Sequence, residues 1–495
     1  MRPSYRLNER TLAHHARRVS VPSYDRAALT RGVAHISVGS FHRSHQAVYF
    51  DELARRGLGD GWALTGVGLH RREMKEALDA QDGLYTLVER GDDGDTARVV
   101  GVITRYLFAP EETEAVLRAL ADASTRLVTL TITGPGYKLD LETGAFESDD
   151  PAVLADLDNP VAPRSAVGLV VEALDRRRRA GRAPFTVLSC DNIPANGAVA
   201  RAAVVGYATL RDRDLASWIE EYVTFPSSMV DRIKPTTAAA DRALVEREFG
   251  VRDRWPVVTE PFSQWVVEDS FCNGRPPLDE VGVQFVEDVR PYALMKTRLL
   301  NGTHSALGYL GSLAGHERSD EVMSDPVFAA YAERLMAGEI APLLPPVETD
   351  LEAYATTLRA RFGNRALADR LARLCRNGST KVPAHLLSSI REARAMGRPH
   401  ALLTLAVAAW CVHLRGRHGG RRIELDDPDG ERLRALARTG GADPRPLLAD
   451  DATFGSLGRC PRFAAGVERD IRDLCDRDAR AVIADRTEHA QFATR

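Results

Sequence analysis

One lysine, one asparagine and one histidine lie within nine residues of a leucine-rich, helix-forming segment, as Lys296, Asn301 and His304. A buried lysine can lose its proton near neutral pH, because desolvation disfavours the ammonium form, and it can then act as a general base. The amide of an asparagine can donate hydrogen bonds to an oxygen that gains negative charge during a reaction. These side chains therefore suit proton transfer at a hydroxyl or carbonyl group.

The spacing of the three residues does not suit a regular α-helix. Asn301 and His304 share a face, whereas Lys296 lies about 140° around an ideal helix from Asn301 and about 7.5 Å along its axis. We therefore expect either a flexible lysine side chain or a helix irregularity near Gly302. The alternative interpretation is a core helix whose lysine reaches solvent and whose histidine is capped.

The elements that must position these residues change in character along the chain. The first half alternates β-like and helical runs, which indicates a parallel sheet covered by helices. From about Tyr292 onward nearly every segment has helical periodicity. We therefore predict an α/β first domain, residues 1–286, and a mainly α-helical second domain, residues 287–495. The predicted strands are 33–38, 62–69, 99–107, 126–133 and 185–189, and the predicted helices follow Phe41 and span 111–123, 165–180, 327–336, 351–361, 366–375 and 401–414.

Composition and charge exclude several classes of partner. The 495 residues carry 66 basic and 69 acidic side chains, well mixed, which argues against a nucleic-acid or anionic-membrane partner. The longest apolar run, 401–414, is shorter than the ~20 residues that a membrane span needs. Six scattered cysteines without a CxxC pair are typical of reduced thiols, so we expect a cytoplasmic protein.

A glycine-containing turn follows the first predicted strand, where the sequence reads Ser37-Val38-Gly39-Ser40-Phe41-His42. In such a turn, backbone N–H groups can approach the pyrophosphate of a dinucleotide. The match to the GxGxxG fingerprint is poor, since Ser37 stands at the first glycine and His42 at the third. Serine is acceptable at the first position if its φ is negative. His42 and His45 are also three residues apart, but no further His or Cys lies nearby and we expect no metal.

Nine motifs follow one another along the chain: HISVGSFHRSHQ, GVGL, AQDGLYTLVER, LVTLTIT, SCDNIPANG, FPSSMVDRIKP, EPFSQWVVED, MKTRLLNGTHSALGYLG and GSTKVP. Together they resemble the polyol-specific long-chain dehydrogenase/reductase family, and most of all its mannitol 2-dehydrogenases. The resemblance covers Leu7 to about Asp426. It implies a Rossmann-type N-terminal domain and a mainly helical C-terminal domain, with the active site between them. It also implies metal-independent hydride transfer between NAD(P) and a sugar alcohol/ketose pair, D-mannitol and D-fructose first, by a monomer or small homo-oligomer.

The resemblance also implies roles for individual residues. Lys296 resembles the general acid/base, Asn192 and Asn301 resemble the amide pair that holds the reacting oxygen, and His304 resembles a ligand of a substrate hydroxyl. The positions that line the polyol pocket are Asp231, Arg373 and Lys381. The positions expected to bind the cofactor are Ser37, Val38, Gly39, Phe41, Gly68, Arg72 and Glu73.

The segment after Gly68 departs from the family pattern, in which acidic residues accept hydrogen bonds from the adenosine ribose. Here the sequence after Leu69 reads His70-Arg71-Arg72-Glu73. Glu73 keeps one acid for NAD, while Arg72 could neutralise the 2′-phosphate of NADP. We therefore predict NAD use with NADP tolerated.

Two further departures concern the active site itself. Relatives carry a glutamate after the fourth strand, where this chain has Gly134, and another three residues before the lysine, where it has Ala293. Both changes remove a carboxylate that could relay protons or hold polyol hydroxyls. We expect their loss to favour the neutral amine of Lys296 and to alter proton exchange.

Two alternative functions stay open. One is a reductase for a sugar acid of the fructuronate or tagaturonate type, which needs a cation for the substrate carboxylate. The other is a catalytically retired homologue that binds cofactor as a sensor. Retention of Lys296, Asn192, Asn301 and His304 argues against the second, since a binding module has no need of a base flanked by two donors.

Overall fold

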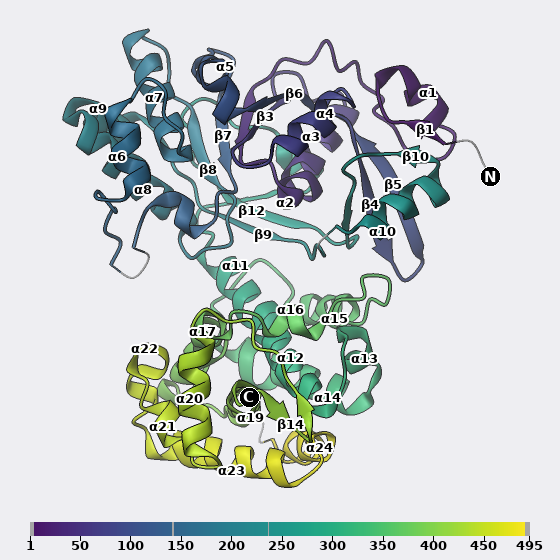
Figure 1. Cartoon of the computed structure of the whole chain (residues 1–495), viewed down its shortest axis with the longest axis vertical. Coiled ribbons are helices and arrows are strands. Elements are labelled where there is room, and N and C mark those ends of the chain that lie inside the picture. The colour runs from purple at the N-terminus through teal and green to yellow at the C-terminus, as the bar shows by residue number, and fades with distance from the viewer. Residues whose placement is uncertain (1–3, 141–142, 236, 491–495) are drawn as a thin grey trace. The chain divides into compact units, whose positions relative to one another are not determined.

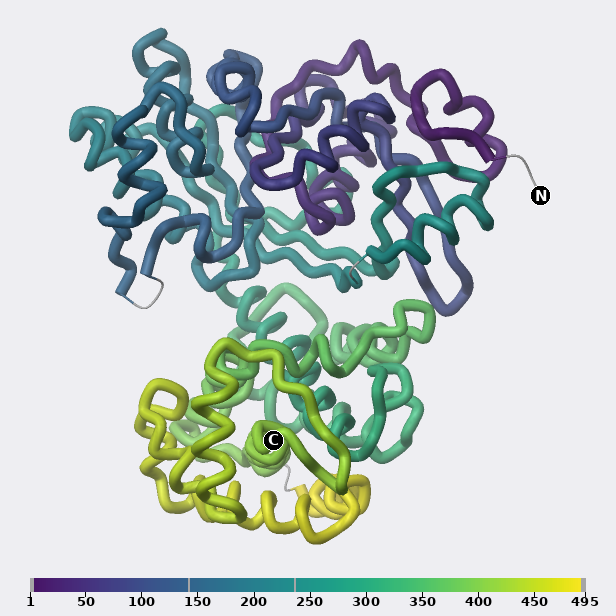
Figure 2. Tube along the Cα trace, viewed as in Figure 1, coloured from purple at the N-terminus to yellow at the C-terminus, as the bar shows by residue number. Residues whose placement is uncertain are grey.

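The computed structural model describes residues 4–140, 143–235 and 237–490. The chain forms two compact units, Met1–Arg290 and Pro291–Arg495, which Figure 2 traces from purple to teal and from there to yellow. The first unit is an α/β domain and the second is mainly helical, so the predicted fold class is confirmed. No helix among the described residues is long and apolar enough to cross a membrane.

A five-stranded parallel sheet forms the centre of the first unit (Figure 1). The strands run in the order β6-β3-β2-β7-β8. The order reverses between β2 and β7, and doubly wound sheets of this kind bind ligands at the carboxyl ends of the strands near the reversal. The strand bounds are β2 (Val33–Ile36), β3 (Leu64–Gly68), β6 (Ile103–Phe108), β7 (Leu127–Leu130) and β8 (Thr186–Ser189).

Helices cover both faces of this sheet, because successive residues of a strand point to opposite sides. Ala34 and Ile36 pack in a core with helices α5 (Ala109–Ala121), α7 (Ala166–Arg179), α8 (Asn196–Arg211) and α9 (Arg213–Tyr222). Val33 and Leu64 pack in a second core with α3 (Gln46–Arg55) and α4 (Arg72–Asp79). Both faces of the strands are therefore apolar.

The predicted strand 99–107 is wrong, since the chain changes sheets within it. Residues 99 and 100 end β5 (Gly94–Val100), which forms a long hairpin with β4 (Tyr85–Gly91), and β6 begins at Ile103 (Figure 1). The break lies at Gly101, whose N–H donates to Asp51 (2.8 Å) and whose carbonyl accepts from Arg26 (2.7 Å). These side-chain bonds take the place of strand pairing.

The other elements of the first unit surround the sheet and hairpin. They are α1 (Leu12–His15), α2 (Ser40–Ser44), α6 (Pro151–Asp158), α10 (Ala239–Leu244), and the sheets β1-β10 (Tyr5–Arg6, Val251–Arg252), β11-β4-β5 (β11 Val257–Thr259) and β13-β12-β9 (Gln284–Val286, Gln264–Glu268, Ser228–Asp231).

The second unit packs around α19 (Ala401–Leu414), which is buried from Leu402 onward and contacts α12 (Thr303–Ala314) and α23 (Pro461–Asp476). The predicted bounds of α19 are confirmed, whereas the predicted helix 366–375 begins only at α16 (Leu371–Cys375), because Ala368 has a φ of 50°.

The other elements of the second unit are α11 (Arg290–Met295), α13 (Ser319–Ser324), α14 (Pro326–Arg334), α15 (Leu351–Phe362), α17 (Gly378–Val382), α18 (Ser388–Ala395), α20 (Gly430–Gly440), α21 (Arg445–Leu448), α22 (Asp451–Phe454), α24 (Ala479–His489), β14 (Arg417–His418) and β15 (Arg421–Arg422).

Candidate active site

The turn after β2 contains the first departure from sequence expectation. Ser37 has a φ of 73°, in the left-handed region, so the condition under which serine replaces glycine without strain is not met. Hydrogen bonds hold the backbone on both sides: the Ser37 N–H donates to the Val67 carbonyl (2.8 Å), and the Thr131 hydroxyl donates to the Ser37 carbonyl (3.0 Å). The surrounding strands therefore impose this conformation.

The same turn has room for a phosphate. Gly39 is the N-cap of α2, and no side chain caps the N–H groups of the first turn. A Cβ built on Gly39 would meet only the Ser37 carbonyl oxygen, at 3.8 Å, so no protein atom crowds this side of the backbone. Val38 is buried and Phe41 half-buried beside it. These residues fit the pyrophosphate of a dinucleotide.

His42 occupies the third fingerprint position, and its side chain is buried against the parallel sheet. Its ring lies 3.4 Å from that of His35 in β2, and the two planes are 11° apart. His35 bonds to Thr129 (2.7 Å) and Thr131 (2.9 Å) of the neighbouring strand. Burial lowers the pKa of His35 to about 3 and that of His42 well below its usual value, so both rings are neutral.

These histidines belong to the core. The ring of His45 bonds to the Gln264 carbonyl (2.9 Å). Among the described residues no group of three or more His, Cys, Asp or Glu side chains could hold a metal ion.

The end of β3 carries the positions expected at the adenosine. Gly68 packs tightly, since a Cβ there would lie 2.2 Å from the Tyr106 hydroxyl. Arg72 and Glu73 are exposed in the first turn of α4. Arg72 forms ion pairs with Glu111 (3.3 Å) and Glu76 (3.6 Å) across the surface.

Asn192 is exposed in the loop after β8, and its neighbour Asp191 ties that loop to the end of β7. The Asp191 carboxylate accepts from the N–H groups of Ile132 (3.0 Å) and Thr133 (2.9 Å) and from the Tyr137 hydroxyl (2.8 Å). Thr133 has a φ of 63°, so this part of the loop is strained as well.

Asn196 secures the other end of the loop. Its amide donates to the carbonyls of Ser189 (3.2 Å), Asp191 (2.9 Å) and Ser228 (2.9 Å), and its carbonyl accepts from the Ser228 N–H (2.9 Å). Sequence reasoning did not single out Asp191 or Asn196, whose hydrogen-bond partners come from separate segments.

Asp231 ends β9 and is buried, opposite Gln264 of β12. The neighbouring Arg232 is also buried; it donates to the Glu260 carbonyl (2.8 Å) and forms an ion pair with Glu89. This segment is therefore part of the core and not a solvated cluster of charges.

Lys296, Asn301 and Gly302 lie in a π-helical segment, Lys296–Gly302, inserted between α11 and α12. The expected helix irregularity is thus present. A π turn adds one residue to the helical turn, so Asn301 lies about 40° from Lys296 around the axis instead of about 140°. Lys296 and His304 are buried and Asn301 is half-buried. Local geometry therefore turns the lysine toward the face that carries the amide and the imidazole.

His304 lies in α12 with its ring centroid 4.1 Å from that of Phe362. Its Nε2 atom is buried and has no hydrogen-bond partner among the described residues. Burial, together with the charges of Arg373, Arg361 and Lys381, lowers the pKa of His304 well below its usual value. The ring is a neutral imidazole whose one buried nitrogen can bond to a hydroxyl group.

Cations line this part of the second unit. Arg373 in α16 forms an ion pair with Asp369, and half-buried Lys381 in α17 donates to the Leu374 carbonyl (3.4 Å). His385 lies in another π-helical segment, Pro383–Leu387, and bonds to the Ser305 hydroxyl (3.3 Å). Burial, with the charges of Lys381 and Lys296, lowers the pKa of His385 to about 3. Sequence reasoning missed His385.

The two positions that lack glutamate lie in different units of the chain. Gly134 begins a short 3-10 turn, Gly134–Tyr137, in the first unit. Ala293 is half-buried in α11, one turn before Lys296 in the second.

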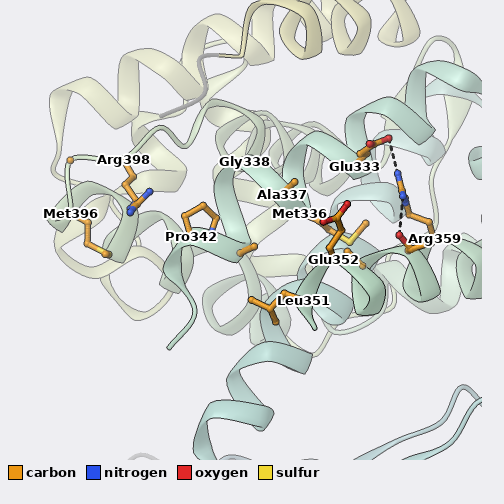
Figure 3. A pocket seen from close by; sticks show the side chains of 14 residues that line it. Glu333, Met336, Ala337, Gly338, Pro342, Leu351, Glu352, Arg359, Met396 and Arg398 are labelled. Atoms are coloured by element: carbon orange, nitrogen blue, oxygen red, sulfur yellow. Dashed lines mark hydrogen bonds and ion pairs between the residues drawn. The ribbon is translucent and has the colours of Figure 1, made fainter. Parts of the chain in front are cut away.

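A hollow of the second unit with a volume of about 930 Å³ lies elsewhere (Figure 3). It is lined by α14, α15 and the turn after α18, with an ion pair between Glu333 and Arg359 (2.7 Å) at one side. None of the residues expected at the active site lines it.

Comparisons with known proteins agree with this division of the chain. The mannitol dehydrogenase Rossmann domain matches residues 31–280, and the mannitol dehydrogenase C-terminal domain matches residues 288–475. A mannitol 2-dehydrogenase of Aspergillus fumigatus is 43% identical over 484 residues, covering 95% of this chain and 96% of the relative.

Two solved structures are similar over nearly the whole chain. The Pseudomonas fluorescens mannitol 2-dehydrogenase, a ternary complex with NAD and D-mannitol, is 42% identical with a TM-score of 0.86, over 98% of this chain and 100% of that one. A D-sorbitol dehydrogenase in substrate-free form is 36% identical with a TM-score of 0.90, over 96% and 100%.

Proposed function

The chain belongs to the mannitol dehydrogenase family, and from this premise we propose that it transfers a hydride between a nicotinamide dinucleotide and a sugar alcohol/ketose pair, D-mannitol and D-fructose. The observation that carries the proposal is the π-helical segment Lys296–Gly302, which turns a buried lysine toward Asn301 and the unpartnered nitrogen of His304. Single π turns within α-helices are frequent at functional sites.

Lys296 is the proposed general acid/base. In polyol oxidation its neutral amine takes the proton of the C2 hydroxyl, and in ketose reduction its ammonium returns that proton to the oxygen. The bound nicotinamide accepts or donates the hydride. Catalysis by the amine needs no metal.

Asn192 and Asn301 are the proposed donors to the reacting oxygen. Their amides are neutral, so they stabilise a developing alkoxide without competing for its proton, and losing one such donor typically costs ~10²-fold or more in turnover. The buried Nε2 of His304 bonds to a second substrate hydroxyl. Asp231, Arg373 and Lys381 are proposed to bind the remaining hydroxyl groups.

Residues 1–286 are the proposed cofactor domain and residues 287–495 the substrate and catalytic domain. The open backbone at Gly39 supports binding of the pyrophosphate by the turn 37–41. The NAD bound to the Pseudomonas fluorescens enzyme supports NAD as cofactor. Glu73 is proposed to bind the adenosine ribose, and exposed Arg72 to tolerate the additional phosphate of NADP. We propose a cytoplasmic monomer or small homo-oligomer.

A second candidate function is reduction of a sugar acid. Half-buried Lys381 has no carboxylate within ion-pair distance among the described residues, and Arg373 lies near it. These cations could hold a substrate carboxylate, and neither Gly134 nor Ala293 supplies a negative charge to oppose it.

The decisive experiment measures NADH oxidation with fructose, other ketoses, fructuronate and tagaturonate, and NAD reduction with mannitol and sorbitol. The wild type is compared with Lys296→Ala and with Lys75→Ala, which removes a lysine paired on the surface with Asp79 and Glu112. We expect mannitol and fructose to be preferred, Lys296→Ala to abolish turnover, and Lys75→Ala to retain it.

Preference for a ketouronate would replace the main proposal by the second. Cofactor binding without turnover of any substrate would identify a retired homologue. Full turnover by Lys296→Ala would overturn the lysine mechanism.

A further inference from the structure

Asp191 carries a buried negative charge that no described cation neutralises. The side chain follows β8 at the carboxyl edge of the parallel sheet, and the residue is 8% exposed. All three hydrogen bonds to the carboxylate come from neutral donors, two backbone N–H groups and the Tyr137 hydroxyl. Among the described residues no basic side chain forms an ion pair or a hydrogen bond with this carboxylate. Buried charges are normally paired, so a single one at a ligand-binding edge requires an explanation.

The position of Asp191 in the sheet indicates which part of a dinucleotide it would meet. A doubly wound sheet holds one mononucleotide over each half, on either side of the strand-order reversal. The turn with Gly39 follows β2, and the expected adenosine positions follow β3, so the adenosine half is β6-β3-β2. Asp191 follows β8, in the half that remains for the nicotinamide.

Holding the loop does not by itself account for a carboxylate at this position. Neutral acceptors could bond to the same N–H groups, as the Asn196 carbonyl does for Ser228. A charge adds a field that acts on a charged ligand. The nicotinamide ring is positively charged when oxidised and neutral when reduced, so a fixed negative charge distinguishes the two forms.

We propose that Asp191 is a positioning and electrostatic residue that stabilises the oxidised, positively charged nicotinamide relative to the reduced form. The inference rests on the proposed function, because it requires that the protein bind the cofactor. Asp191 takes no proton from the substrate and does not replace Lys296.

The test is equilibrium binding of NAD⁺ and NADH to wild type, Asp191→Asn and Tyr137→Phe, with thermal unfolding as a control for folding. The asparagine removes the charge. The Tyr137→Phe variant removes one donor to the same carboxylate but keeps its charge, so it reports on loosening of the loop alone.

We expect Asp191→Asn to weaken the binding of NAD⁺ about tenfold more than the binding of NADH. In a partly buried site, the attraction between two opposite charges within several ångströms of each other contributes a free energy of that size. The reduction potential of the bound couple should rise accordingly, by about 30 mV for a tenfold change in a two-electron couple. Tyr137→Phe should change both affinities by the same factor. Equal losses of NAD⁺ and NADH affinity in Asp191→Asn would overturn the proposal and leave only a structural role.

A second measurement needs no variant and covers the case in which Asp191→Asn does not fold. The wild type should bind NAD⁺ about tenfold more tightly than an isosteric dinucleotide in which neutral benzamide replaces nicotinamide. Equal affinity for these two ligands would also refute the inference. A wild type that binds neither NAD⁺ nor NADH would instead refute the proposed function, so the two failures are distinguishable.

Discussion

Ser37→Gly should make the first unit more stable, although it removes a side chain. Ser37 has a φ of 73°, and hydrogen bonds to Val67 and Thr131 prevent its backbone from relaxing. A residue with a Cβ in the left-handed region costs roughly 1–2 kcal/mol. Glycine removes that cost but gives the unfolded chain more freedom, which offsets roughly 0.4–1 kcal/mol. The net expectation is a gain of about 0.5–1 kcal/mol in the free energy of unfolding.

Ser37→Ala is the matched control, because alanine keeps the Cβ and removes only the hydroxyl. We expect alanine to change stability little, since the Ser37 hydroxyl forms no hydrogen bond with another described residue, and only the backbone of Ser37 is bonded. Urea unfolding of wild type, Ser37→Gly and Ser37→Ala measures the difference, which corresponds to a shift in Tm of about 1–4 °C for a unit of this size. A glycine variant no more stable than the alanine variant would show that the backbone strain is not stored at Ser37.

Four further substitutions test other parts of the structure. Glu339 accepts from the N–H groups of Leu402 and Leu403, and burial raises its pKa from 4.5 to about 7. Because the pKa of Glu339 is raised in the folded state, its contribution to stability is fully present below the unfolded pKa of 4.5 and is lost as pH rises through 7. In denaturant titrations between pH 6 and pH 8, the free energy of unfolding of the wild type should therefore fall by about 1 kcal/mol relative to that of Glu339→Gln. Arg72→Glu should raise KM for NADP severalfold and leave KM for NAD nearly unchanged; unchanged NADP kinetics would contradict the assignment of Arg72. Gly197→Ala should destabilise the first unit by about 2 kcal/mol or more, because its Cβ would lie 2.4 Å from the Phe225 carbonyl oxygen. Gly39→Ala should fold normally, because its Cβ meets no close atom, and should weaken cofactor binding as measured by NADH titration.

The π-helical segments of the second unit share a feature that sequence reasoning could not see. Segments Lys296–Gly302, Leu335–Ile340 and Pro383–Leu387 each carry a titratable side chain: buried Lys296, buried Glu339 and half-buried His385 respectively. Each segment is continuous with an α-helix and has helical composition. The sequence pointed to the extra residue only at Lys296–Gly302, where the spacing of Lys296 and Asn301 does not suit a regular α-helix.

The failures at the strand level have a similar cause. Apolar β-rich runs predicted β2, β3, β7 and β8 within a few residues, because each is a local pattern between turn signals. The run 99–107 has the same composition throughout, and only the long-range bonds of Gly101 to Asp51 and Arg26 divide it between two sheets. Likewise, Ser37 adopts a positive φ because Val67 and Thr131 hold it, and neither lies near it in the chain.

The sequence by itself determined the fold class, the family, the buried helix 401–414 and the chemistry available at Lys296, Asn301 and His304, since these depend on residue type, periodicity and motif order. Tertiary structure decided how those groups are presented. It placed the π turn that rotates Asn301 toward Lys296, left the His304 Nε2 atom without a hydrogen-bond partner among the described residues, and surrounded Asp191 with donors from 54 to 59 residues away. Helix register, burial and electrostatic environment all depend on which distant segments pack together, and no local pattern of residues encodes that packing.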